Sequence, residues 1–366
     1  MLTMEMIREA QERLRGVARV TPLNGAKTLG RNVYMKAENL QLTGAFKLRG
    51  AYNKLCTLTE EERARGVIAC SAGNHAQGVA LSATRLGIRS VICMPAGAPI
   101  SKVEATKNYG AKVVLVPGTY DDAAAEADRL AAQEGYTFAH PFNDPYVMAG
   151  QGTIGLEILE QLPEADQVVV PIGGGGLISG VAYAIKNRKP SCRVIGVQAA
   201  GAASMYTSRQ AGEVLTLPSV ATIADGIAVK RPGDLTFALC QQYVDDIVTV
   251  RDDEIAAAIL ALLEDQKTVA EGAGAVSVAA VMFGKVDLVG KNTVCVVSGG
   301  NVDVTTLSRI ITKGLSKTGR ITEFTVKIAD KPGSLVQLLQ TISKTGANIL
   351  SVNHAREDKH SDIGAC

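Results

Sequence analysis

Lys47 stands in a setting that would allow its amine to react. It lies in the run TGAFKLRGA, which extends from Thr43 to Ala51 and is mostly small or apolar. Thr43 is a favourable helix N-cap, so we expect the lysine in the first turn of a helix. Most lysines keep their ammonium group in water. Burial beside the positive end of a helix would instead lower the pKa of the amine and allow it to form a Schiff base at neutral pH.

Two further segments have the composition of anion-binding sites. The run SAGNH, at 71–75, opens a helix after an apolar strand-like run, where free N–H groups and the helix dipole favour a carboxylate. The run GGGGL, at 173–177, also stands between a strand and a helix, and its glycines let the backbone approach a phosphate closely. Each run alone could be an ordinary helix cap or turn, and His75 is expected to cap or pack. The candidate residues are Ser71, Ala72, Gly73, Asn74, His75, Gly173, Gly174, Gly175, Gly176 and Leu177.

The glycine-rich run does not fit a nucleotide site. No G-x-G-x-x-G pattern can be drawn through it. The position about twenty residues further on, where an acid would bind a ribose, is Gln198. The glycine-lysine pattern of P-loop proteins is absent as well.

Ser298 ends the apolar run Thr293–Val297 and precedes two glycines and Asn301. A hydroxyl there can donate to a neutral pyridine nitrogen, whereas an aspartate would keep that nitrogen protonated. The amine, the carboxylate site, the phosphate site and this hydroxyl are together the groups needed to hold pyridoxal phosphate beside an amino acid. A serine at this place favours β-elimination, because the departure of a leaving group relieves the carbanion.

The elements that must position these groups follow an α/β pattern. Short β-branched runs alternate with amphipathic helical stretches, which predicts doubly wound parallel sheets. Ligands in such sheets bind at the carboxyl ends of the strands, and the three polar segments above all follow strand-like runs. The polar run 313–319 is expected to be a linker. After it we expect a strand at 323–329, a helix at 334–345 and a second strand at 348–352.

Composition excludes several classes of protein. With 366 residues, 46% hydrophobic and 20% charged, the chain is expected to form two or three globular domains. A formal net charge of +2 gives no reason to expect nucleic acid or membrane partners. The first 20 residues carry charges throughout and contain no signal-peptide core. The seven scattered cysteines include no Cys-x-x-Cys pair, so we expect neither a metal site nor disulfides, and a cytoplasmic location.

Over about residues 5–320 the quoted motifs resemble those of the fold-type II enzymes that use pyridoxal phosphate, and within them the threonine/serine dehydratases. The resemblance implies a large cofactor-binding domain (1–40 and 141–316) and a small substrate-side domain (41–140). It implies that Lys47 forms the Schiff base with the cofactor, with Phe46 packed nearby, and that Asn74 contacts the ring oxygen. The run 71–75 would hold the substrate carboxylate, the run 173–177 the phosphate, and Ser298 the ring nitrogen. Gln151, Gly152, Thr153 and Glu271 match family positions near the site.

The implied reaction converts L-threonine to 2-oxobutanoate and ammonia, and L-serine to pyruvate. A serine-preferring dehydratase and a serine racemase remain alternatives, as does a non-catalytic sensor of amino acids or effectors. Racemases of this fold carry a second serine where this chain has Ala72. Some relatives bind a divalent cation through acidic side chains, but this chain has Gln198, Ala202 and Ser204 at the corresponding places. We therefore expect no metal and little racemisation.

Residues 323–355 resemble the first half of an ACT domain, a small regulatory module that binds amino acids or other effectors. The likeness rests on DKPGSL (330–335) and GANI (346–349). Relatives with one such module resemble the catabolic or general type of dehydratase, whereas the isoleucine-inhibited type usually has a longer C-terminal region. A half-module would leave strand edges unpaired, so we expect the partial segment 321–366 to be mobile or completed by another chain. We also expect a homo-oligomer, either a dimer or a tetramer, and a possible small effector.

Overall fold

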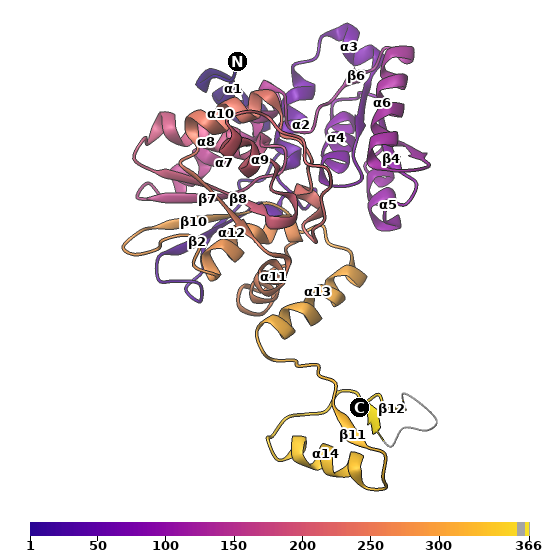
Figure 1. Ribbon diagram of the computed structural model, residues 1–366. Coiled ribbons are helices and arrows are strands. Elements are labelled where there is room, and N and C mark those ends of the chain that lie inside the picture. Colours follow the sequence, from indigo (N-terminus) through magenta and orange to yellow (C-terminus); the bar gives the residue numbers. More distant parts are fainter. Residues whose placement is uncertain (357–362, 366) are drawn as a thin grey trace. The chain divides into compact units, whose positions relative to one another are not determined.

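The structure is a computed structural model that describes residues 1–356 and 363–365 (Figure 1). The chain divides into two compact units, Met1–Thr318 and Gly319–Cys366. Each unit is described by itself below.

The first unit contains two sheets, as the alternating pattern predicts. The larger sheet has six strands, and every neighbouring pair is parallel except the antiparallel pair β1–β2. Its order is β1 (Leu23–Gly25), β2 (Val33–Ala37), β10 (Thr293–Val297), β7 (Gln167–Pro171), β8 (Arg193–Ala199) and β9 (Asp246–Val250). The smaller sheet is wholly parallel. Its order is β5 (Lys112–Val116), β4 (Ser90–Pro95), β3 (Val67–Cys70) and β6 (Thr137–Phe138).

Helices cover both sheets, and the smaller sheet lies among α3 to α6 in Figure 1. The helices of the first unit are α1 (Met4–Leu14), α2 (Lys47–Cys56), α3 (Glu60–Arg65), α4 (Asn74–Arg85), α5 (Ile100–Asn108), α6 (Tyr120–Glu134), α7 (Pro145–Gln161), α8 (Gly176–Arg188), α9 (Ser204–Ala211), α10 (Asp234–Tyr243), α11 (Asp252–Gln266), α12 (Gly272–Met282) and α13 (Val304–Lys317). Three short 3₁₀ turns are η1 (Glu38–Leu40), η2 (Ala200–Ala202) and η3 (Asp225–Ile227).

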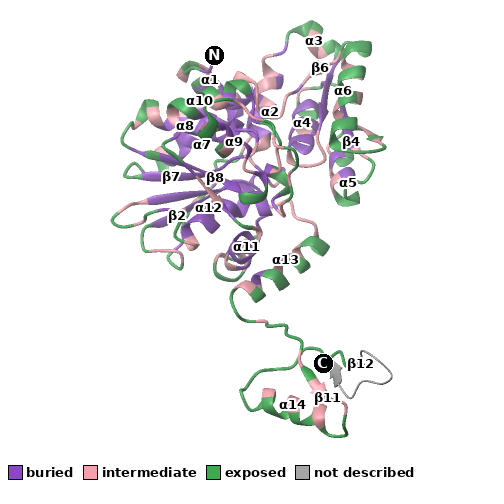
Figure 2. Ribbon diagram, in the orientation of Figure 1, coloured by how far each residue is buried: buried purple, intermediate pink, exposed green. Residues whose placement is uncertain are grey.

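The large sheet is buried on both faces, as Figure 2 shows. Successive residues of β7 point to opposite sides, so Val168 and Val170 pack with Ile178 of α8. Val169 packs on the other side, with Ile259 of α11. A continuous apolar strand is what a sheet buried on both faces requires, and this explains the unbroken hydrophobic runs of the sequence.

A cluster of buried charges fixes α2 in place. The Arg49 guanidinium donates to both carboxylate oxygens of Glu38, at 2.9 and 2.8 Å, and to both of Glu157, at 2.6 and 2.9 Å. Lys36 donates to Glu157 at 2.6 Å. Arg49, Glu38 and Lys36 are at most 1% exposed. This cluster therefore ties α2 to β2, η1 and α7 through satisfied hydrogen bonds.

The helix that ends the first unit is longer than the sequence predicts. The polar run 313–319 was expected to be a linker, but α13 continues to Lys317. Gly314 is buried, and a Cβ there would lie 2.8 Å from the carbonyl oxygen of Ala256 in α11. Close packing on α11 thus outweighs the low helix propensity of glycine.

The second unit contains β11 (Lys327–Ala329), α14 (Ser334–Ser343), β12 (Ala355–Arg356) and β13 (Ile363–Ala365). Its three strands form an antiparallel sheet in the order β11-β13-β12. The helix lies where it is predicted, and the first strand covers only the end of the predicted range. The prediction of a strand at 348–352 is wrong, because this stretch has no regular structure and Leu350 is 73% exposed. Unpaired strand edges are expected for a half-module, whereas β13 pairs with both β11 and β12. The ACT-like interpretation itself stays a prediction.

Candidate active site

Lys47 is the first residue of α2 and lies directly beside the end of β10. The N-cap position is Phe46, whose N–H donates to the carbonyl of Ser298 at 3.1 Å. Ala45 forms an isolated β-bridge with Gly299. The prediction that Thr43 caps this helix is wrong, since its hydroxyl instead donates to the carbonyl of Ala45 at 3.3 Å. Two segments about 250 residues apart, each singled out by its composition, are thus hydrogen-bonded neighbours.

The amine of Lys47 is shielded from much of the solvent, and the residue as a whole is half-buried. Its Nζ donates to the carbonyl of Pro141 at 2.9 Å and lies 5.3 Å from the centre of the Phe46 ring. Burial lowers the pKa of Lys47 to about 8, and the nearby Glu271 carboxylate opposes part of this effect. At pH 7 roughly a tenth of such amines would be neutral. The desolvated lysine expected from the sequence is therefore present.

Asn74 is held by two side chains from other parts of the chain. Its Nδ2 donates to Glu271 Oε1 at 2.6 Å, and its Oδ1 accepts from Asn301 Nδ2 at 2.8 Å. Asn301 also donates to the carbonyl of Thr43 at 2.7 Å. These bonds join the start of α4, the start of α12, the loop after β10 and the Lys47 segment. The orientation of the Asn74 amide is therefore fixed from both ends.

Glu271 is a buried carboxylic acid in this network. It is 4% exposed. Burial and the neighbouring Asp225 raise its pKa to about 7, while the bond from Asn74 and the charges of Lys102 and Lys47 oppose the rise. A carboxyl whose pKa lies near neutrality beside a lysine with a lowered pKa is a pattern concentrated at functional sites.

The run 71–75 bends from β3 into α4. Ser71 Oγ accepts from the N–H of Gly73 at 3.2 Å, and α4 begins at Asn74 without a side-chain cap. Helix geometry leaves the N–H groups of its first turn without intrahelical acceptors, which suits an anion. Ala72 packs beside the core of the smaller sheet. His75 is buried and donates from Nε2 to the carbonyl of Ala139 at 2.8 Å, so it packs as expected.

The glycine-rich run leads from β7 into α8. Gly175 has a φ of +99°, a conformation that glycine adopts readily. A Cβ at Gly174 would overlap the ring of Phe142, and one at Gly176 would lie 2.8 Å from the Phe142 Cα. The close approach of Phe142 thus explains why positions 174 and 176 need glycine. The first turn of α8, which includes Leu177, leaves N–H groups without intrahelical acceptors, and these can bind an anion.

Ser298 is 2% exposed, and its Oγ donates to the carbonyl of Ala273 at 3.3 Å. This bond is long for a hydroxyl donor, whose usual distance is near 2.7 Å, so little is lost when the hydroxyl turns to another acceptor. A desolvated amine, two open helix N-termini, a fixed amide and this hydroxyl fit the aldehyde, phosphate and ring of pyridoxal phosphate.

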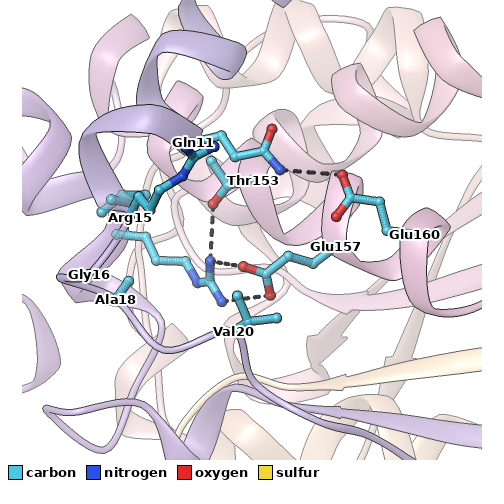
Figure 3. A pocket seen from close by; sticks show the side chains of 10 residues that line it. Gln11, Arg15, Gly16, Ala18, Val20, Thr153, Glu157 and Glu160 are labelled. Atoms are coloured by element: carbon cyan, nitrogen blue, oxygen red, sulfur yellow. Dashed lines mark hydrogen bonds and ion pairs between the residues drawn. The ribbon is translucent and has the colours of Figure 1, made fainter.

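Two of the weaker candidates serve the scaffold instead. Thr153 accepts from Arg49 Nη1 at 3.2 Å. A Cβ on Gly50 would overlap the Gln151 amide, so Gln151 lies in the contact of α2 with α7. A pocket of about 180 Å³ adjoins these residues, between α1, the loop after it and α7 (Figure 3). It is lined by Gln11, Leu14, Arg15, Gly16, Ala18, Val20, Arg49, Thr153, Glu157 and Glu160, none of which is a predicted cofactor or substrate residue.

The sequence interpretation missed the segment 139–143 and Asn301 as a partner of Asn74. The pair Asp144-Pro145, an N-cap followed by proline at the first helical position, marks the start of α7 and could have drawn attention to the preceding histidine. Within residues 1–356 and 363–365, no cluster of three or more His, Cys, Asp or Glu could hold a metal ion. Gln198 bonds instead to the carbonyl of Ala202 and the N–H of Tyr206. No helix in the same ranges is long and apolar enough to cross a membrane.

Comparison with known proteins gives one consistent result. The family model described as pyridoxal-phosphate dependent enzyme matches residues 14–299. The L-threonine ammonia-lyase of Thermotoga maritima is 53% identical over all of this chain and 92% of that protein. The catabolic L-threonine dehydratase TdcB of Escherichia coli K12 is 50% identical over 76% of this chain and 85% of that protein.

Solved structures of two kinds of enzyme superpose on this chain. Threonine deaminase isoform 2 from Solanum lycopersicum, in its processed form, superposes with a TM-score of 0.81 at 40% identity, covering 84% of this chain and 87% of that one. Maize serine racemase superposes with a TM-score of 0.80 at 38% identity, covering 87% of this chain and 99% of that one.

Proposed function

The chain belongs to the family of pyridoxal-phosphate-dependent enzymes, and we propose that within it this protein deaminates L-threonine to 2-oxobutanoate and ammonia, and L-serine to pyruvate. The observation that carries the proposal is the desolvated amine of Lys47, which lies beside the Asn74 and Ser298 segments. The relative that matches over the whole chain is an L-threonine ammonia-lyase.

The cofactor is placed by groups that converge from distant parts of the chain. Lys47 holds its aldehyde carbon, and Phe46 packs beside it. The N–H groups at the start of α8, in the run 173–177, hold the phosphate. Asn74 donates to the ring oxygen, and the Ser298 hydroxyl donates to the ring nitrogen. When bound, the cofactor supplies a delocalised system that accepts the electron pair of the broken Cα–H bond.

Proton transfer is the task of Lys47. Its pKa of about 8 leaves a useful fraction of neutral amine near neutral pH, and that amine accepts the Cα proton of the substrate. The Pro141 carbonyl, at 2.9 Å from Nζ, orients the ammonium that results. Glu271, linked to the site through Asn74, offsets the positive charge of that ammonium.

The substrate carboxylate binds at the run 71–75, where N–H groups of the first turn of α4 and the Ser71 hydroxyl can donate to it. Elimination then breaks the Cα–H and Cβ–O bonds and releases the β-hydroxyl as water. Hydrolysis takes one water back as ammonia leaves, so threonine gives one 2-oxobutanoate and one ammonia.

Serine racemisation is the weaker alternative. It requires a proton donor on the face of the substrate opposite Lys47, and Ala72 stands where racemases of this fold carry a serine. An alanine side chain cannot donate a proton, so L-serine should give pyruvate with little D-serine.

The proposed organisation follows the two sheets. The large domain comprises 1–40 and 141–316 with the six-stranded sheet, and the small domain comprises 41–140 with the four-stranded sheet. The segment 321–366 acts as a partial regulatory module for a small effector. The enzyme is cytoplasmic, assembles as a dimer or tetramer, and serves either threonine catabolism or isoleucine biosynthesis; its single partial module resembles that of the catabolic or general type.

The test is a keto-acid assay with L-threonine and L-serine, with and without AMP, isoleucine and valine, combined with chiral analysis of the remaining serine. We expect 2-oxobutanoate from threonine, pyruvate from serine, and D-serine at less than about a hundredth of the pyruvate rate. Absence of keto acid from both substrates in protein loaded with cofactor would overturn the proposal. D-serine formed as fast as pyruvate would favour the racemase.

A further inference from the structure

The segment 139–143 connects β6 of the smaller sheet to α7, which packs on α8 beside the larger sheet. It is therefore the crossing point from one sheet to the other. We call it the crossover segment. Its backbone and side chains contact three of the groups assigned above to the active site.

Two imidazoles bond to the backbone of the crossover segment, one from α4 and one from within the segment itself. His75 Nε2 donates to the carbonyl of Ala139 at 2.8 Å. His140 Nδ1 accepts from two N–H groups of its own loop, that of Phe142 at 3.2 Å and that of Asn143 at 2.8 Å. An imidazole nitrogen that accepts cannot carry a proton, so His140 must be neutral with its hydrogen on Nε2.

The segment fixed in this way positions the lysine. The carbonyl of Pro141, one residue after His140, accepts from Lys47 Nζ at 2.9 Å. The carbonyl of Pro141 and the N–H of Phe142 belong to one planar peptide unit, so the bond from that N–H to His140 Nδ1 fixes the direction of the carbonyl. Loss of the Nδ1 acceptor would therefore allow the Pro141 carbonyl to turn away from the amine of Lys47.

The same segment positions the glycine-rich run. Phe142 approaches so closely that a Cβ at Gly174 would overlap its ring. Asn143 Oδ1 accepts from the N–H of Leu235 at 3.0 Å, at the start of α10. The hydroxyl of Thr236, next in that helix, donates to the carbonyl of Gly174 at 2.6 Å. The turn held by His140 thus contacts the glycine-rich run directly through Phe142, and indirectly through the bond from Asn143 to the start of α10.

We propose that His140 is a positioning residue, whose Nδ1 lone pair fixes the turn that places the Pro141 carbonyl on the amine of Lys47 and Phe142 against the glycine-rich run. This role belongs to the same site as the proposed function. It rests on that function only where threonine turnover is the quantity measured. It assigns His140 no contact with substrate or cofactor.

The surroundings of His140 keep it neutral over the working pH range. Burial and the charge of Lys47 lower its pKa to about 4, and the carboxylate of Asp144 opposes part of the shift. His75, which also faces this region, has a pKa lowered to about 3 by burial and by Lys47. The Nδ1 acceptor of His140 should therefore persist from alkaline pH down to about pH 5.

Two substitutions separate the role of Nδ1 from the bulk of the ring. His140→Asn puts a carbonyl oxygen at the δ position, and asparagine readily accepts from N–H groups that follow it in the chain. His140→Gln carries the same amide one carbon further out and removes the δ acceptor. We expect the Asn variant to keep kcat for threonine within about threefold, and the Gln variant to lose at least tenfold, with KM changing less than kcat.

Cofactor loading gives a readout that does not depend on turnover. Each variant is titrated with pyridoxal phosphate, reduced with borohydride, and the modified fraction at Lys47 is measured by peptide mass spectrometry. We expect the concentration for half loading to rise at least fivefold for His140→Gln and less than twofold for His140→Asn. Thermal melting of both variants establishes that they are folded.

The wild-type protein provides a test that needs no substitution. With ¹⁵N-labelled histidine, only four imidazoles contribute signals. We expect His140 to show the Nε2–H tautomer and no titration between pH 8 and pH 5. A protonated Nδ1, a midpoint near 6.5, or equal behaviour of the Asn and Gln variants in both loading and turnover would each overturn the proposal. If wild-type protein fails to deaminate threonine, the proposed function fails while the tautomer and loading comparisons still decide the role of His140.

Discussion

The two units of this chain differ in how far their helices are buried. In the first unit α12 has ten buried residues among its eleven, from Gly272 to Val281. In the second unit α14 has none, and Leu335, Leu338, Leu339 and Ile342 are only half-buried. An amphipathic pattern marks α14, whereas α12 is apolar on all sides, as a helix in the interior of a large unit must be. The depth at which a helix is buried depends on how many other elements supply apolar partners.

The proposed active site belongs to the unit whose helices are more deeply buried. Every residue assigned here to cofactor, substrate or positioning lies before residue 302, inside the first unit. Burial is what lowers the pKa of Lys47 and raises that of Glu271, so such groups need a deep interior.

The largest effect is expected from Lys47→Ala. Loss of the amine removes both the attachment point of the cofactor and the base for the Cα proton, so turnover of threonine should fall by at least about a thousandfold. Because Lys47 is the first residue of α2 and its side chain makes one hydrogen bond, the substitution should change the melting temperature little. Keto-acid release and circular dichroism melting measure the two quantities. Near-native turnover in a folded variant would show that the site is misassigned.

A stability effect is expected from Arg49→Leu. The change would leave the carboxylates of Glu38 and Glu157 buried without their principal partner, which typically costs about 3–5 kcal/mol of unfolding free energy. The matched control is Arg129→Leu, which removes an exposed ion pair with Glu126 and should change the unfolding free energy far less. Urea unfolding measures both. Equal destabilisation by the two changes would mean that the buried cluster does not anchor α2.

A smaller and more selective effect is expected from Ser298→Asp. An aspartate would keep the ring nitrogen protonated and stabilise the carbanion longer, so elimination should slow and transamination should appear. The control is Ser298→Ala, which removes the hydroxyl without adding a charge. Product analysis by mass spectrometry after incubation with threonine would reveal an amino form of the cofactor. An unchanged rate and product spectrum would exclude Ser298 as the partner of the ring.

The smallest effect is expected from removal of the second unit. A chain that ends at Thr318 keeps α13 and every residue of the site, so kcat for threonine should stay within about twofold of the full-length value. Any response to AMP, isoleucine or valine should be lost. A tenfold fall in kcat, with the melting temperature unchanged, would show that the second unit contributes to catalysis.

Much of the architecture could be predicted because it follows from local patterns. The alternating runs predict the parallel sheets, and the positions of Ser71, Gly173 and Ser298 after strands predict that their segments meet at strand ends. The structure joins two of these segments, because Asn301 Nδ2, in the loop after Ser298, donates to Asn74 Oδ1 in the run 71–75 at 2.8 Å.

The features that could not be predicted depend on contacts between distant residues. Gly314 is tolerated inside α13 only because it packs on Ala256. The stretch 348–352 has an apolar pattern but remains irregular. His140 bonds to N–H groups of its own turn and so sets the direction of the Pro141 carbonyl. That direction is important only because the amine of Lys47, nearly a hundred residues earlier in the sequence, bonds to this carbonyl. A local sequence motif carries no information about a contact between residues so far apart in the chain.

The most direct test of the central claim is to locate the cofactor on the chain. The protein is incubated with pyridoxal phosphate, reduced with borohydride and digested, and the modified peptide is sequenced by mass spectrometry. We expect one modified residue, Lys47, at close to one cofactor per chain, with no labelling at that position in Lys47→Ala. Labelling spread over surface lysines such as Lys107 or Lys230, with Lys47 unmodified, would contradict it.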